Sequence, residues 1–141
     1  CLIAARINLG DTLLTPEQLA IIAGLSAMIG HLVPLYAKFK GGKGVATGAG
    51  MVLFLAPLEI GFALIVFAAT LAITRYVSLS SILATMFLGI SILLEKYYLG
   101  YPLGSEMIIL AFVLIAIILY THKSNISRLI AGEENKLGAK K

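Results

Sequence analysis

A glycine- and lysine-rich turn at residues 40–44 combines residue types that bind phosphate. It reads Lys-Gly-Gly-Lys-Gly and opens directly into an apolar stretch. Glycines let backbone N–H groups approach an anion closely, the lysines add positive charge, and the N-terminus of the following helix favours anions. The turn is not a P-loop, because Lys43 is followed by Gly44 rather than by Ser or Thr. The alternative is an ordinary basic turn beside a membrane, and the spacing alone does not decide between them.

Two serines lie near the expected start of a later helix. Ser78 and Ser81 are three residues apart, so they would share one helix face and could donate hydrogen bonds to a phosphate. The alternative is that serines here cap the helix, because serine oxygens accept bonds from the first N–H groups of a helix. Residue type and position fit both interpretations.

A third polar cluster follows the last apolar stretch. His122 and Asn125 are three residues apart and would face the same way on a helix continuing from the membrane, with Arg128 about two turns beyond His122. His122 could act as general acid or base near neutral pH, and Asn125 could orient it or a substrate. On spacing alone, an amphipathic tail at the membrane interface is the simpler interpretation.

The elements that position these clusters are apolar helices. The chain has 141 residues, 60% of them hydrophobic and only 13% charged, whereas soluble domains are about a quarter charged. Apolar stretches cover residues 18–39, 45–73, 76–94 and 107–120, which leaves no room for a soluble domain. We therefore expect an all-α, polytopic transmembrane bundle forming a single domain over residues 1–141.

Charge and a proline predict the topology. Most Lys and Arg residues follow the first, second and fourth apolar stretches, and basic residues collect at cytoplasmic flanks. Four simple crossings would put the residue 40–44 turn and the C-terminal tail on opposite faces. Residues 45–73 would be about 43 Å long as one helix, which is too long for one untilted span. The conflict disappears if Pro57 breaks this stretch into a hairpin of two helices. We expect about five helices and a cytoplasmic C-terminus; the alternative is one kinked, tilted helix.

Other chemistries have little support in the sequence. The lone Cys1 excludes an internal disulfide and a cysteine-based metal site, and no His, Cys, Asp or Glu set has metal-ligand spacing. The basic residues flank membrane stretches without interleaved aromatics, so nucleic acid is not an expected partner. We expect neither a metal nor another cofactor.

Taken together, the three clusters resemble the PlsY family, the bacterial acyl-phosphate:glycerol-3-phosphate acyltransferases. Residues 30–34 with 39–47 match the family's second motif, residues 74–81 resemble its serine segment, and residues 122–134 match its third motif. The first motif, Gly-Ser-Gly-Asn-x-Gly-Ala-Thr-Asn-x-x-Arg, is absent. Since that motif supplies a Ser and an Arg to the family's active site, we expect the chain to lack N-terminal helices and to have an incomplete site.

The resemblance implies acyl transfer from acyl phosphate to the 1-hydroxyl of sn-glycerol 3-phosphate in phospholipid synthesis. Implied partners are these two substrates, the lipid bilayer and the enzyme that forms acyl phosphate; the implied location is the bacterial inner membrane. The family pattern assigns activity to His122 and Asn125 and structural integrity to Glu134. Expected substrate contacts are Lys40, Gly41, Gly42, Lys43, Gly44, Ser78, Ser81 and Arg128. The main alternative is an organic-phosphate transporter or channel subunit; another is a scaffold whose basic tail binds anionic lipid.

Overall fold

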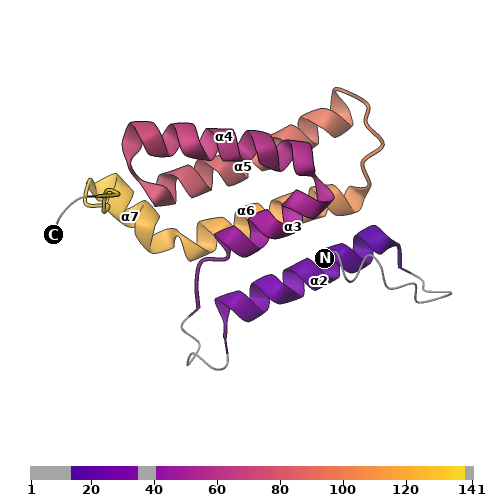
Figure 1. Ribbon diagram of the computed structural model, residues 1–141, viewed down its shortest axis with the longest axis horizontal. Coiled ribbons are helices and arrows are strands. Elements are labelled where there is room, and N and C mark those ends of the chain that lie inside the picture. The colour runs from indigo at the N-terminus through magenta and orange to yellow at the C-terminus, as the bar shows by residue number, and fades with distance from the viewer. Residues whose placement is uncertain (1–13, 35–40, 139–141) are drawn as a thin grey trace. The chain divides into compact units, whose positions relative to one another are not determined.

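All regular secondary structure in the described part of the chain is helical. The structure, a computed structural model, describes residues 14–34 and 41–138. Six helices lie in these ranges (Figure 1): α2 Pro16–Leu32, α3 Val45–Leu55, α4 Pro57–Thr74, α5 Val77–Tyr97, α6 Ser105–Thr121 and α7 Lys123–Ala131. The predicted all-α class is confirmed. The chain divides into two compact units, residues 1–58 and 59–141, so the expected single domain stays a prediction.

The first unit contains α2 and α3, which pack against each other. A capping box starts α2: the Thr15 hydroxyl accepts from the Gln18 N–H at 3.2 Å, and the Gln18 side chain accepts from the Thr15 N–H at 3.0 Å. Met28 on α2 and Met51 on α3 are among the buried side chains. The predicted span over residues 18–39 corresponds to α2, and its last part lies outside the described residues.

The predicted break at Pro57 is confirmed. Helix α3 ends at Leu55, Ala56 leaves helical geometry with φ −145° and ψ 70°, and α4 begins at Pro57. Proline suits the first position of a helix because that N–H has no partner within the helix. With 11 residues, α3 is about 17 Å long, shorter than the roughly 30 Å hydrocarbon core of a bilayer. Separate crossings by α3 and α4 remain a prediction.

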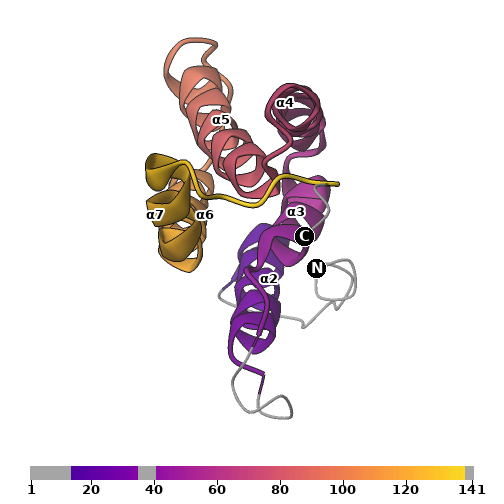
Figure 2. The ribbon, with the colours of Figure 1, turned by 90° about the vertical axis from the view of Figure 1, so that its left-hand side faces the viewer.

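The second unit contains the longest apolar helices. By length and composition, α4 and α5 can cross a membrane, and α6 with α7 would form a third span if this bent pair is one broken span. Of α4, only Ile60 and Ala63 are buried, so most of its apolar surface faces outward, as it does in a lipid-facing helix. Figure 2 shows α5, α6 and α7 lying together, and α5 packs most extensively on α6.

Gly89 of α5 lies close to the Ile115 side chain of α6. A Cβ placed on Gly89 would lie 2.5 Å from Cδ1 of Ile115, so the end of that side chain would have to move to make room for it. Leu88, Ile92, Leu110 and Leu114 are among the buried residues of this helix pair. This packing of α5 on α6 positions the polar residues at the start of α5 and at the end of α6.

Candidate functional site

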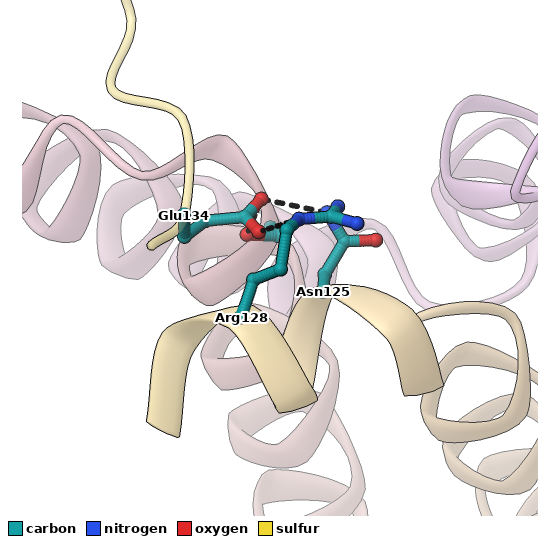
Figure 3. A network of polar contacts seen from close by, with 4 residues as sticks. Asn125, Arg128 and Glu134 are labelled. Carbon is teal, nitrogen blue, oxygen red and sulfur yellow. Dashed lines mark hydrogen bonds and ion pairs between the residues drawn. The ribbon is translucent and has the colours of Figure 1, made fainter. Parts of the chain in front are cut away.

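The Glu134 carboxylate connects the start of α5 with α7. Its Oε1 accepts hydrogen bonds from the Ser78 hydroxyl at 2.9 Å and from Nδ2 of Asn125 at 2.6 Å. Its Oε2 accepts from Nε of Arg128 at 2.8 Å, which is also an ion pair. Figure 3 shows Asn125 and Arg128 projecting from α7 toward Glu134, which lies on the segment after the helix. We call Ser78, Asn125, Arg128 and Glu134 the Glu134 cluster.

The Glu134 cluster holds its carboxylate in the charged form. Burial raises the pKa of Glu134, but the hydrogen bonds from Asn125, Ser78 and Arg128, with the positive charge of Arg128, outweigh burial and lower that pKa below its ordinary value. The Glu134 side chain is 6% exposed and that of Arg128 is 40% exposed. The charge is therefore compensated inside the cluster, while part of the guanidinium remains at the surface.

A left-handed glycine brings Glu134 back over α7. Gly132 ends the helix with φ 73°, and the Glu133 N–H donates to the Arg128 carbonyl at 2.8 Å. This is the usual way in which glycine closes a helix C-terminus and reverses the chain direction. The reversal lets a residue six positions after Arg128 contact its side chain.

His122 lies at a break between two helices. The expected continuous helix is wrong here: α6 and α7 are bent by 61°, and His122, with φ −99° and ψ 7°, caps both. Its side chain is 2% exposed, and its Nδ1 lies 2.9 Å from the Ile118 carbonyl oxygen. A carbonyl oxygen only accepts, so this bond requires the proton on Nδ1. In the neutral ring, Nε2 is then the nitrogen that carries the lone pair.

The serines of α5 do not cap their helix. The N-cap is Tyr76, which makes no side-chain capping bond, and the serine hydroxyls donate instead. Ser80 donates to the Tyr76 carbonyl at 2.8 Å and Ser81 to the Val77 carbonyl at 2.9 Å, whereas Ser78 donates to Glu134. The capping interpretation is therefore wrong. All three serines are buried, and of their three hydroxyls that of Ser78 bonds to a distant part of the chain.

The glycine turn belongs to the first unit. Gly42 donates its N–H to the His31 carbonyl at 3.3 Å, and Gly44, with φ 78°, is the N-cap of α3. A Cβ on Gly42 would collide with the His31 imidazole, and one on Gly41 would collide with the carbonyl oxygens of residues 31 and 32. Glycine is thus required by close approach to backbone at residue 41 and favoured by backbone conformation at residue 44, whereas a Cβ at residue 42 would displace the His31 ring. Lys43 is exposed, and Lys40 lies outside the described residues.

Comparison with known proteins decides the family. A family model described as glycerol-3-phosphate acyltransferase matches residues 1–132. This chain belongs to the glycerol-3-phosphate acyltransferase family. The curated glycerol-3-phosphate acyltransferase of Shouchella clausii is 43% identical over 139 residues, which cover 99% of this chain and 65% of that protein. The one from Salinibacter ruber is 40% identical over 121 residues, covering 86% of this chain and 53% of that protein.

Solved structures give the same family. The crystal structure of PlsY, an integral membrane glycerol 3-phosphate acyltransferase, in its glycerol 3-phosphate form is similar with a TM-score of 0.75 at 37% identity, covering 86% of this chain and 57% of that chain. Its lysophosphatidic acid form gives the same TM-score and identity. The chain spans about half to two thirds of the length of these relatives. As a member of the acyltransferase family with apolar helices, it is a multi-pass membrane protein.

Sequence reasoning missed several contacts of this acyltransferase family member. It placed Ser78 in a different cluster from Asn125 and Arg128, whereas all three donate to Glu134. It also gave no role to Lys136, whose Nζ lies 5.7 Å from the centroid of the Tyr76 ring. Ser78 is 56 residues from Glu134, and Tyr76 and Lys136 are far apart in sequence as well, so no local pattern marks these two contacts. In the part of the chain that the structure describes, no group of three or more His, Cys, Asp or Glu residues is placed to hold a metal ion.

Proposed function

We propose that this chain is part of an enzyme that acylates sn-glycerol 3-phosphate on its 1-hydroxyl, using acyl phosphate as donor. Support comes from family membership and from the two PlsY forms, whose names give glycerol 3-phosphate and lysophosphatidic acid. The observation that carries the proposal is the pair His122 and Asn125. Both are buried, His122 at the end of the apolar helix α6 and Asn125 in α7, where its side chain donates to Glu134.

The proposed reaction needs little from a cofactor. The 1-hydroxyl oxygen attacks the acyl carbonyl carbon, the new C–O ester bond forms, the bond between that carbon and the phosphate oxygen breaks, and inorganic phosphate leaves. Acyl phosphate is already activated, so neither a metal nor a nucleotide is required. Two groups could take the hydroxyl proton: Nε2 of His122, made the lone-pair nitrogen by the Nδ1 bond to Ile118, and a phosphate oxygen of the substrate.

Phosphate binding is proposed for the glycine turn and the basic residues. Residues 41–44 offer a glycine backbone at the N-terminus of α3, with the lysines of residues 40 and 43 beside it. Nε of Arg128 donates to Glu134. Because a guanidinium group has five N–H donors and this side chain is 40% exposed, its other donors can bind a phosphate. Ser78 and Ser81 would have to turn their hydroxyls from Glu134 and Val77 to bind phosphate.

The proposed setting is the cytoplasmic face of the bacterial inner membrane, with a cytoplasmic C-terminus. The basic residues after α6 support this side, because Lys and Arg collect there. Acyl phosphate combines an apolar chain with a charged head, so it would enter from the bilayer while glycerol 3-phosphate arrives from water. The enzyme that makes acyl phosphate is the proposed protein partner, because its product is the donor.

The test is acyl transfer from acyl phosphate to labelled glycerol 3-phosphate in liposomes. Two proteins are compared: this chain, and a hybrid in which this chain is joined to the part of the Shouchella clausii relative that lies outside the matched region. We expect lysophosphatidic acid and inorganic phosphate in equal amounts, strongly reduced by His122→Gln or Asn125→Ala. The control is Ser127→Ala, an exposed residue of α7 that should stay near wild-type. Labelled substrate entering liposomes without acylation would support a transporter instead, and no acylation by either protein would refute the proposal.

A further inference from the structure

Two contacts join the segment after α7 to the turn between α4 and α5, and a third joins it to the first turn of α5. We call residues 133–137 the C-terminal strap. Its Leu137 N–H donates to the Arg75 carbonyl at 2.7 Å, the Nζ of Lys136 lies over the Tyr76 ring, and Glu134 accepts from Ser78. In Figure 2 the yellow segment that follows α7 crosses the end of α5 where this turn lies.

The turn that receives the strap has a fixed, unusual backbone. Arg75 has φ 61°, the left-handed region that residues other than glycine rarely adopt. Its N–H still donates to the Leu71 carbonyl at 2.9 Å, so it closes α4, and Thr74 accepts from the Tyr76 N–H at 3.2 Å. Strained backbone of this kind persists only where its surroundings fix it. The Arg75 carbonyl accepts from the Leu137 N–H of the strap.

Within the strap, only Glu134 is turned inward. Glu133, Asn135, Lys136 and Leu137 are exposed, whereas the Glu134 side chain is 6% exposed and meets Asn125. An extended segment has no internal hydrogen bonds to hold such a geometry. Besides the bonds of Glu134 itself, the position of the strap is set at its two ends, by the Glu133 bond to Arg128 on one side and by the Leu137 and Lys136 contacts on the other.

We infer that Lys136, Tyr76 and the Leu137 N–H are positioning residues: by anchoring the far end of the C-terminal strap they hold Glu134 against Asn125. The expected effect on catalysis rests on the proposed function, whereas the anchoring of Glu134 does not. None of the three anchors touches the residues proposed to contact substrate, except through Glu134. Loosening the anchors therefore lowers the fraction of molecules with Asn125 in place and leaves the glycine turn unchanged.

Two matched pairs of variants test the anchors. Leu137→Pro removes the donor N–H, whereas Leu137→Ala keeps it and changes only an exposed side chain. Lys136→Met removes the charge over Tyr76, whereas Lys136→Arg keeps a cation there. We expect Leu137→Pro to lower kcat about fivefold and Lys136→Met about threefold, with KM for glycerol 3-phosphate unchanged. Lys136→Arg and Leu137→Ala should stay within about twofold of wild type.

Hydrogen exchange and thermal unfolding separate the anchoring from the catalysis. Residues 133–137 should exchange faster in Leu137→Pro and Lys136→Met than in their matched controls. The loss of melting temperature caused by Leu137→Pro should shrink in a Glu134→Gln background, because both changes act through one contact. Unchanged exchange, fully additive melting shifts, or a raised KM with normal kcat would overturn the inference. If the wild type shows no acyl transfer, the proposed function fails, and exchange with thermal coupling still decides whether the strap anchors Glu134.

Discussion

Glu134→Gln should destabilise the fold, although residue 134 lies outside the helices, because its side chain is 6% exposed and its carboxylate accepts three hydrogen bonds. The variant keeps one carbonyl oxygen for Ser78 or Asn125 but places an amide N–H group opposite Nε of Arg128, so two donors face each other. Hydrogen bonds to a charged group contribute roughly 1.5–3 kcal/mol each. Because Arg128 is 40% exposed and can turn to water, its share is discounted. The expected loss is about 1–3 kcal/mol.

The measurement is thermal unfolding of the purified chain in detergent. A loss of about 1–3 kcal/mol corresponds to a fall in melting temperature of roughly 3–10 °C for a chain of this size. The matched control is Glu133→Gln, which removes the same charge from an exposed neighbour and should shift the melting temperature by less than about 2 °C. Equal shifts for the two variants would refute the conclusion that the Glu134 cluster stabilises the fold.

Three further predictions follow from the same structure. The pKa of Glu134 is lowered in the folded chain, so the unfolded chain binds more protons than the folded chain as pH falls through the ordinary value of 4.5. The free energy of unfolding, measured against pH, should therefore fall in that range, and it should fall less steeply in Glu134→Gln. Gly42→Ala should raise KM for glycerol 3-phosphate, because the added Cβ collides with the His31 imidazole. The double variant Gly42→Ala with His31→Ala lacks that collision, so steady-state kinetics should show its KM returning toward the wild-type value. A cysteine replacing Glu59, in a background without the native cysteine, should react with an impermeant thiol reagent from outside the cell, and labelling only from the cytoplasm would contradict the hairpin at Pro57.

The helices could be predicted from the sequence because their causes are local. Apolar runs separated by charged or glycine-rich residues mark α4, α5 and α6, and Pro57 marks the break before α4. The bend at His122 has no such marker, since neither proline nor glycine lies within residues 119–131. It arises where α6 ends and α7 turns to pack on both α5 and α6, which is a tertiary effect.

The chemistry of the site could be predicted by residue type but not by partner. Ser78 and Glu134 are separated by 56 residues, so their hydrogen bond depends on how α5 and α7 pack. A serine near a helix start is equally suited to capping, to a phosphate and to a carboxylate, because its hydroxyl both donates and accepts. Sequence alone does not choose among these partners, and in this structure the Ser78 hydroxyl donates to the Glu134 carboxylate.

The bonds that three side chains make to Glu134 change how a loss of activity in a variant is interpreted. Ser78, Asn125 and Arg128 all donate to one carboxylate, so removing any of them leaves Glu134 with fewer donors and disturbs the other two. An inactive Ser78→Ala enzyme is therefore no sign that Ser78 contacts substrate. The distinction lies in coupling: a residue that acts only through Glu134 loses its effect once Glu134 is replaced, whereas a true phosphate ligand keeps a separate effect on KM.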